Sequence, residues 1–279
     1  MLVGHVRVSS IIRSHRVIYK PGFTFLLFGL LMLVACTEPV PDVMEPLTAA
    51  LSPSAEEIHQ RALVLDAHAD IEIPGKESRY AGADGRSRVA PDKMRAGGVD
   101  AVVMAVAVGP GPRDAQGYAE SRAKAEEELA AVIKLTEDPS NNLVLARSAD
   151  ELVGAHRSGK GALILGFQNA RILGTDVSVL DSFFDAGVRV FALTHMGHND
   201  FADSSRPIYI AEQGAHEPVE EHGGLSELGR SAIKRINELG GIIDVSQLSR
   251  AATLQVLDLS SAPVIASHSN VRQIGRAHV

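Results

Sequence analysis

The stretch Val64-Leu65-Asp66-Ala67-His68-Ala69-Asp70-Ile71 joins an apolar run to an imidazole and a carboxylate. The run at residues 63–66 has the composition of a β-strand, and side chains along a strand point to alternate faces. His68 and Asp70 are two residues apart, so we expect them to point the same way at the end of this strand. A histidine nitrogen and a carboxylate oxygen together suit a divalent metal such as zinc. The stretch therefore predicts a metal site, provided that other segments aim similar groups at the same point.

Strand-like and helix-like segments alternate along the chain from residue 55 onward. Apolar strands that alternate with helices indicate a parallel sheet with both faces covered. A doubly wound sheet would place a glycine-rich phosphate loop after its first strand, whereas this chain has His68 and Asp70 there. Polar groups at the ends of successive strands are typical of an α/β fold of the (β/α)8 TIM-barrel type. We count six of the eight strands, at residues 63–66, 100–108, 162–167, 188–194, 242–245 and 263–266, with helices at residues 116–136, 226–239 and 250–257.

The ends of the later predicted strands also carry polar side chains. These are Gln168 and Asn169 after the third strand, Thr194 and His195 after the fourth, with His198, Asn199 and Asp200 close behind, Ser246 and Gln247 after the fifth, and Ser267, His268 and Ser269 after the sixth. A single histidine at a strand end is most often structural, but several that meet around one barrel axis indicate a shared polar site. We therefore expect a site that contains His68, Asp70, His195 and His268. Asp66 and Asp244 lie among apolar residues and could orient neighbouring ligands or simply bond to the backbone.

Composition narrows the class of protein. The chain has 279 residues, which is enough for one large α/β domain. Its net charge is −7 and it has no stripe of Lys and Arg, so nucleic-acid binding is not expected. Tryptophan is absent and aromatic residues make up 4%, which also argues against a base-stacking surface. Cys36 is the only cysteine, so the sequence has no disulfide framework.

The N-terminal segment has the organisation of an export signal. A basic segment precedes an apolar stretch at residues 23–34, which is too short to span the ~30 Å hydrocarbon core of a bilayer and fits a signal peptide. It ends in Leu33-Val34-Ala35-Cys36, which resembles a bacterial lipobox, so residues 1–36 are predicted to be a lipoprotein-type signal peptide with Cys36 lipidated. An ordinary signal peptide with an incidental cysteine is the alternative. Residues 37–54 are rich in Pro, Ala and Glu and predict a tether. We therefore expect a protein exported to the bacterial cell envelope and lipid-anchored to a membrane, facing the periplasm.

Several motifs resemble those of the membrane (renal) dipeptidase family of zinc metallodipeptidases. Asp66-Ala67-His68-Ala69-Asp70 resembles that family's Asp-Gly-His-Asn-Asp motif, and Gly224-Leu225-Ser226 resembles the start of one of its helices. Residues 94–101 resemble the approach to its second strand, and residues 187–195, 243–246 and 262–269 resemble its fourth, fifth and sixth strands. The resemblance covers residues 55–272 and implies a partial (β/α)8 barrel from a bacterial member of the family that is cut short at the C-terminus.

The resemblance also implies roles for particular residues. His68 and Asp70 would bind a first zinc ion, His268 would bind a second, and His195 would contact the substrate and stabilise the tetrahedral oxyanion. The family has a bridging glutamate where this chain has Gln168, and a histidine where it has Gln247. A neutral amide oxygen is a weaker ligand than a carboxylate, so binding of one zinc ion is favoured over two, and binding of none stays open.

By this resemblance the protein is expected to be an enzyme that hydrolyses the peptide bond of dipeptides with metal-activated water, and to share the homodimers of the family. Two alternatives stay open: a metal-dependent amidohydrolase that acts on non-peptide amides or lactones, and a catalytically inactive barrel that binds small peptides. The family's proton-donating aspartate is expected on an eighth strand, beyond the six counted here. Residues 273–279 can be back-translated to the start of a common sequencing adapter, so we expect a non-native tail and a longer natural protein.

Overall fold

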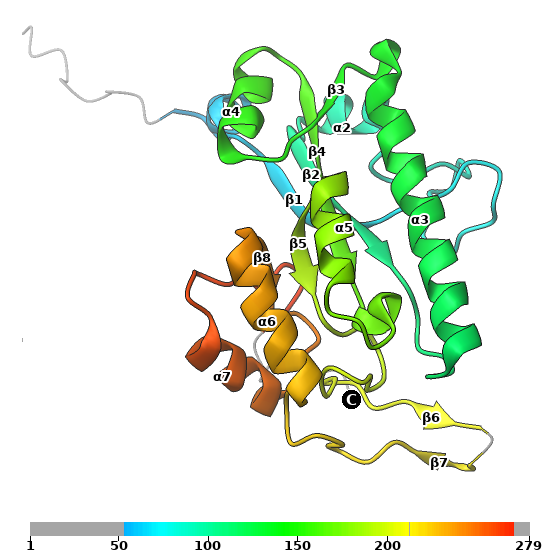
Figure 1. Cartoon of the computed structure of the whole chain (residues 1–279). Coiled ribbons are helices and arrows are strands. Elements are labelled where there is room, and N and C mark those ends of the chain that lie inside the picture. Colours follow the sequence, from blue (N-terminus) through cyan, green and yellow to red (C-terminus); the bar gives the residue numbers. More distant parts are fainter. Residues whose placement is uncertain (1–52, 212, 271–279) are drawn as a thin grey trace, which may run out of the picture. The chain divides into compact units, whose positions relative to one another are not determined.

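The computed structural model describes residues 53–211 and 213–270, all of which belong to the second of two compact units, Leu51–Val279. One sheet contains β1 (Leu65–Asp70), β2 (Ala101–Ala107), β3 (Leu143–Leu145), β4 (Gly161–Gln168), β5 (Val188–Ala192) and β8 (Ile242–Asp244), and a hairpin contains β6 (Tyr209–Ile210) and β7 (Ala215–His216) (Figure 1). The helices are α1 (Ala55–Arg61), α2 (Pro91–Gly97), α3 (Ala115–Glu137), α4 (Ala149–Arg157), α5 (Val179–Ala186), α6 (Glu227–Leu239) and α7 (Arg250–Leu259), with short 3-10 helices at Pro139–Asn141 and Ala170–Leu173.

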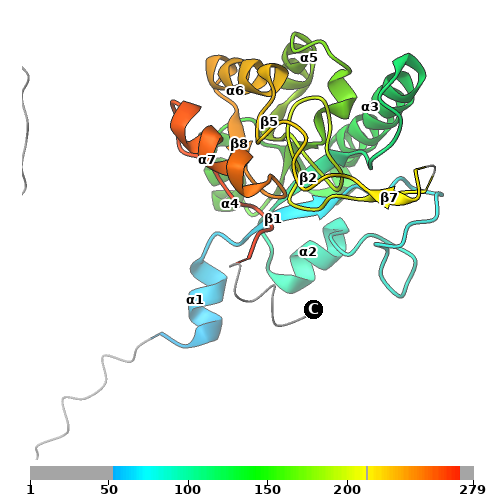
Figure 2. The same cartoon turned by 90° about the horizontal axis from the view of Figure 1, so that it is seen from below.

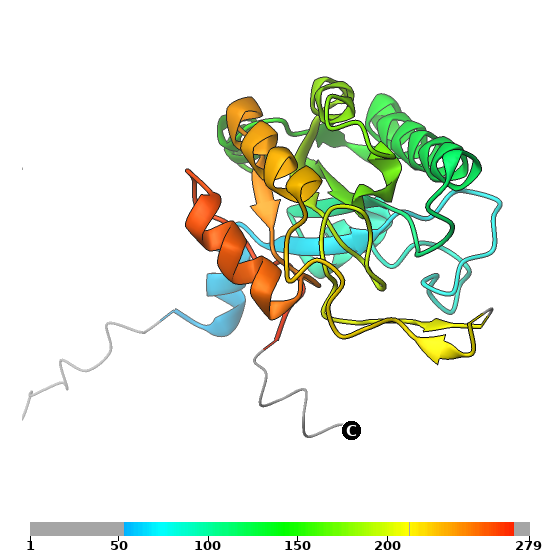
Figure 3. The ribbon, with the colours of Figure 1, turned by 60° about the horizontal axis from the view of Figure 1, so that its bottom comes forward.

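The main sheet is parallel throughout. Its strands follow the order β1, β2, β4, β5, β8, and β3 pairs with the first residues of β4. Strands β2 and β4 stay in register from the pair Ala101 and Ala162 to the pair Ala107 and Gln168. Every residue of β2 except Ala107 is buried, as expected for a parallel strand that is covered on both faces. The sheet curls into part of a barrel (Figure 3), so the carboxyl ends of its strands share one edge.

Three helices cover the outer face of the curled sheet. Helices α6, α5 and α3 lie next to one another in Figures 2 and 3, and α7 packs against α6. Polar side chains cap the start of α3 and of α6: Asp114 Oδ1 accepts the N–H of Gly117 at 2.8 Å, and Ser226 Oγ accepts that of Gly229 at 3.1 Å. Helix α6 ends at Gly240, whose φ of +78° is readily adopted by glycine. Local sequence therefore sets where α3 begins and where α6 begins and ends.

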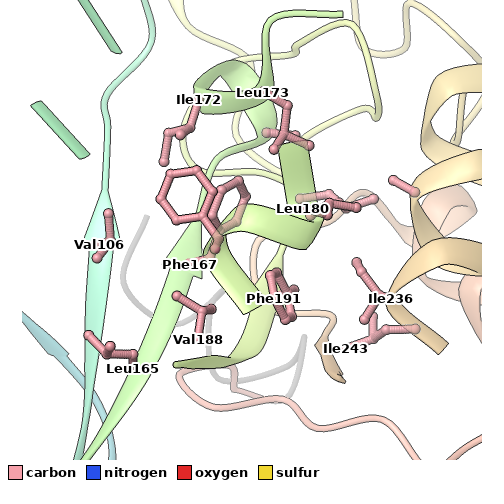
Figure 4. Packing of buried hydrophobic residues seen from close by; sticks show 14 of the residues in the cluster. Val106, Leu165, Phe167, Ile172, Leu173, Leu180, Val188, Phe191, Ile236 and Ile243 are labelled. Carbon is pink, nitrogen blue, oxygen red and sulfur yellow. The ribbon is translucent and has the colours of Figure 1, made fainter. Parts of the chain in front are cut away.

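The core lies between the sheet and these helices (Figure 4). Phe167 of β4 meets Phe183 of α5 edge-on, with ring centroids 5.3 Å apart, and lies 5.8 Å from the ring of Phe191 in β5. Phe191 is fully buried, and so is Ile236 of α6. Aromatic side chains bury large apolar areas, so these contacts fix the sheet against the helices.

The α/β class with a parallel, curled sheet is confirmed, but two predicted strands differ clearly from the observed structure and one observed strand was not predicted. Strand β1 runs to Asp70, so His68 lies inside it, and its pairing with β2 shifts register between Asp66 and Ala69. Strand β3 was not predicted, because its three residues are too few to show a hydrophobic pattern. The segment predicted as a strand at residues 263–266 contributes one bridge, between Asp244 and Ile265.

Several predicted segments lie outside the described residues. These are the signal peptide at residues 1–36 with Cys36, most of the tether at residues 37–54, and the tail at residues 273–279. Ser54, the last residue of the predicted tether, is the N-cap of α1, where its hydroxyl accepts the N–H of Glu57 at 3.2 Å. Within residues 53–211 and 213–270, no helix is both long and apolar enough to cross a bilayer.

Candidate metal centre and substrate pocket

Three metal-binding side chains meet at the shared edge of the sheet. His68 lies in β1, Asp244 ends β8, and His268 follows the bridge between Asp244 and Ile265. One ligand atom from each of the three lies within 4.8 Å of the others. The rings of His68 and His268 have centroids 3.9 Å apart and are tilted by 30°. Two imidazoles and a carboxylate are a ligand set that zinc takes in hydrolases, so a single divalent ion fits these residues.

A chain of hydrogen bonds fixes the orientation of His268. Asp244 is 2% exposed, and its Oδ1 accepts the backbone N–H groups of Ser246 at 2.9 Å and Ser267 at 3.2 Å. Its Oδ2 accepts the hydroxyl of Ser267, whose oxygen lies 2.7 Å from His268 Nδ1. Ser267 has one hydroxyl proton, which it donates to Asp244, so its oxygen accepts the N–H of His268 Nδ1. The proton of the neutral imidazole is therefore on Nδ1, and Nε2 carries a lone pair. Asp244 therefore orients His268 through Ser267.

Two glutamine amides lie beside the free nitrogen of His268. The Nε2 atom of Gln247 lies 2.9 Å and that of Gln168 lies 3.3 Å from His268 Nε2. The Oε1 atom of each glutamine is buried and finds no hydrogen-bond partner among the described residues. The backbone here is unusual, since Gln247 has a φ of +65° and Asn169, next to Gln168, has a φ of +82°. Residues other than glycine rarely adopt such angles, which marks both turns as constrained by their surroundings.

Asp70 and His195 line a neighbouring pocket of about 350 Å³. Asp70 pairs with Ala105 in the sheet and is not one of the three residues whose ligand atoms lie within 4.8 Å. His195 follows β5, and its buried Nδ1 has no hydrogen-bond partner in the described part of the chain. The structure therefore brings His68 and His268 together, as predicted, and places Asp70 and His195 in the adjacent pocket. Charged residues of both signs also line this pocket, namely Glu72, Glu77, Glu128, Lys76, Arg79 and Lys124.

Burial is the largest cause of a lowered pKa at all three histidines of the site. The pKa of His68 falls below the ordinary 6.5 through burial and the neighbouring His268, although nearby carboxylates act in the opposite direction. Burial likewise lowers the pKa of His195 and of His268 against the opposing effect of Asp70. The imidazoles are therefore neutral at pH 7, which is the form that binds a metal ion.

Glu128 is a pocket residue that the sequence did not single out. Its side chain is 7% exposed, its Oε2 accepts the N–H of Ala107 at 2.8 Å, and its Oε1 lies 3.4 Å from Lys124 Nζ. Burial raises the pKa of this carboxyl. The helical period could have identified Glu128 as an inward-facing position. The buried residues of α3 recur at Gly117, Ser121, Ala125, Glu128 and Val132.

Sequence comparison relates the chain to proteins named dipeptidases. Residues 53–278 match the family model described as membrane dipeptidase, peptidase family M19. The chain is 37% identical over 131 residues to dipeptidase tcpJ of Claviceps purpurea, across 47% of this chain and 28% of that protein. It is 34% identical over 132 residues to dipeptidase 3 of Mus musculus, across 47% of this chain and 25% of that protein. The matched segment is thus about a quarter of the length of these curated relatives.

A solved structure shows the same relationship, and a second shows the same fold. The probable dipeptidase PvdM from Pseudomonas aeruginosa is similar with a TM-score of 0.70 and 33% identity, over 78% of this chain and 55% of that chain. A metallo peptidase from Rhodobacter sphaeroides, liganded with a phosphinate mimic of the dipeptide L-Ala-D-Ala, has a TM-score of 0.58 at 21% identity, over 74% of this chain and 65% of that chain. This second likeness shows the fold alone. The family match over most of the chain, together with these relatives, confirms the motif-based prediction that the chain belongs to the membrane dipeptidase family, peptidase family M19.

Proposed function

We propose that the protein containing this chain hydrolyses dipeptides with the help of a bound divalent metal ion. The observation that carries this proposal is the group formed by His68, Asp244 and His268, whose ligand atoms lie within 4.8 Å of one another. The pocket lined by Asp70 and His195 supports it by offering space for a small substrate. Relatives named dipeptidases give the substrate class.

A zinc ion held by His68 and His268, with Asp70 or Asp244, would act as a Lewis acid and activate water at neutral pH. His195 is the residue that we assign to the reacting carbonyl. Its imidazole is neutral and lines the pocket, and since Nδ1 is buried, the other ring nitrogen, Nε2, is the one that can donate to a substrate oxygen. A hydrogen bond that strengthens as negative charge develops on this oxygen would lower the barrier.

The charges of the pocket match a dipeptide, which carries an ammonium group at one end and a carboxylate at the other. Asp70 and Glu72 can attract the ammonium group, and Arg79, which also lines the pocket, can attract the carboxylate. Arg79 stacks over the ring of Tyr80 at 4.8 Å, which holds its guanidinium near the pocket. A zwitterionic substrate therefore fits this lining better than an apolar ester does.

Replacing His68 by alanine in the intact protein tests the proposed function. We expect bound zinc to be lost and dipeptide hydrolysis to fall by at least about 100-fold, because even residues that only support a metal ligand cost 10- to 100-fold. The matched control is His216→Ala, which removes an exposed histidine from the hairpin and should leave activity unchanged. Full activity in His68→Ala would refute the assignment.

The choice of substrates decides between the proposed function and its alternatives. Hydrolysis of L,L- or L,D-dipeptides but not of N-acyl amino acids or lactones supports a dipeptidase. The reverse preference supports an amidohydrolase, for which the neutral Gln168 and Gln247 leave room. Binding of peptides without turnover supports an inactive peptide-binding protein.

We also propose that the protein is exported and anchored through a lipid on Cys36, as the motif Leu33-Val34-Ala35-Cys36 suggests. The test is the distribution of the protein between membrane and soluble fractions of the cell envelope. We expect the wild-type protein in the membrane fraction and Cys36→Ser outside it. An unchanged membrane fraction for Cys36→Ser would contradict lipid anchoring through this residue.

A further inference from the structure

We propose that Gln168 and Gln247 cap His268 Nε2 with their amide N–H groups, so that a metal ion must displace them in order to use this nitrogen. The proposal rests on the proposed function in one respect, namely that the site around His68 and His268 binds a metal ion. It adds that two amide groups of the chain compete with the metal ion for His268 Nε2.

The hydrogen-bond network determines which way the amides face. Ser267 gives its proton to Asp244 and accepts Nδ1–H from His268, so His268 Nε2 carries a lone pair and no proton. A lone pair attracts an N–H group and repels a carbonyl oxygen. Gln247, at 2.9 Å, and Gln168, at 3.3 Å, must therefore present their nitrogens to His268.

The buried oxygens of the two amides show that the capped arrangement has a cost. Oε1 of Gln168 and Oε1 of Gln247 are buried and have no hydrogen-bond partner among the described residues. A buried polar atom without a partner destabilises a protein, so some other interaction must hold the amides as they are. The bonds to His268 Nε2, together with the positive φ of Gln247, supply that constraint.

Competition for one lone pair has a direct consequence for affinity. A metal ion and an amide N–H group cannot occupy the same lone pair, so the hydrogen bonds that stabilise the metal-free site weaken zinc binding by the same free energy. Loss of one such bond should tighten zinc binding about 2- to 10-fold, which corresponds to the net strength of a hydrogen bond between neutral groups. Leucine has a similar size to glutamine and lacks both the donor and the acceptor, so it removes the cap without adding a ligand.

The experiment measures zinc affinity by titration calorimetry with a competing chelator, on the intact metal-free protein and its Gln247→Leu and Gln168→Leu variants. We expect both variants to bind Zn²⁺ more tightly than the wild type, with Gln247→Leu changed more because its contact is shorter. Gln116→Leu, at an exposed position of α3, is the matched control and should leave the affinity unchanged. Weaker binding in Gln247→Leu would overturn the proposal, because it would show that the amide is a metal ligand.

A second measurement does not depend on any variant. Nitrogen-15 chemical shifts of the metal-free wild-type protein report which ring nitrogen of His268 carries the proton. A proton on Nδ1 and none on Nε2 supports the cap, and a proton on Nε2 overturns it.

The outcomes separate this proposal from the proposed function. Tighter zinc binding in the leucine variants without any dipeptide hydrolysis would support the cap and refute the dipeptidase. Dipeptide hydrolysis with zinc affinity unchanged in Gln247→Leu would refute the cap and leave the dipeptidase intact.

Discussion

The pocket beside the candidate metal centre has two unlike walls. The loop that follows β5, residues 193–206, is buried over most of its length and carries His195. The loop that follows β1, residues 71–90, is half-buried or exposed at every position except Ala90. We call these the β5 loop and the β1 loop. The difference shows that one wall is fixed by the fold, while the other is held mainly by interactions at the surface.

Buried polar side chains give the β5 loop its order. Asn199 donates to Leu193 O at 2.7 Å and accepts the N–H of Phe201 at 2.9 Å. His198 accepts the N–H of Ser204 on Nδ1 at 3.0 Å, and its Nε2 lies 2.8 Å from Pro218 O. A loop whose buried groups are paired in this way holds a fixed conformation, which favours a preorganised position for His195.

Exposed ion pairs hold the β1 loop. Lys76 lies 2.5 Å from Glu127 of α3, and Asp84 lies 2.8 Å from Lys93 of α2. Pairs of this kind contribute little to stability, because water and salt screen them. We therefore expect the β1 loop to adapt to the substrate while the β5 loop keeps its shape.

The largest effect is expected from Asp203→Ala in the β5 loop. Asp203 is fully buried, and its two oxygens accept the N–H groups of Glu221 at 2.8 Å, His222 at 3.1 and 3.2 Å, and Gly224 at 2.8 Å. Alanine would leave three N–H groups without a partner, so the free energy of unfolding should fall by about 3 kcal/mol or more. Urea denaturation measures this change.

Lys76→Ala is the matched change in the β1 loop and should alter the free energy of unfolding by no more than about 0.5 kcal/mol. If the two substitutions lowered the free energy of unfolding equally, the β5 loop would be held no more firmly than the β1 loop.

Acid denaturation tests the role of Asp203 in a second way. Burial alone would raise the pKa of Asp203, but the N–H groups that it accepts outweigh burial and hold the pKa below its ordinary value. The stabilisation is therefore present above the unfolded-state pKa of about 4 and is lost as the pH falls through the lower folded-state value. Asp203→Asn should lose less stability than the wild type over that range.

A smaller effect is expected from Gly229→Ala, where α6 contacts the β5 loop. A Cβ atom added at Gly229 would lie 2.0 Å from the carbonyl oxygen of Phe201, so the loop or the helix must move. Overpacking of this kind costs about 1–3 kcal/mol, and thermal unfolding measures it.

Gly154→Ala in α4 is the control, because a Cβ atom there meets no other atom within 4 Å. Alanine should stabilise this helix by up to about 1 kcal/mol. The two substitutions should therefore change the stability in opposite directions. If Gly229→Ala were stabilising, the β5 loop would be as free to move as the β1 loop.

The regular parts of the fold were predictable because their signals are local. Strand β2 is a continuous apolar run, and α6 has both an N-cap serine and a terminal glycine, so each follows from neighbouring residues. Strand β3 was missed because three residues pair with β4 only once the sheet exists. The segment around Ile265 forms one bridge rather than a full strand for the same reason.

The sequence by itself determined the parallel α/β class, the family and the presence of histidines at the strand ends. The family resemblance assigned a role to His195, but no residue pattern showed what His198 does, although both follow β5 within a few residues. The tertiary structure decided that His198 is buried with both ring nitrogens engaged, whereas His195 faces the pocket. It also placed Asp244, Ser267 and two glutamine amides around His268. Apart from Ser267, which directly precedes His268, these residues lie 21 or more positions from His268 in the chain, and only the tertiary fold brings them together.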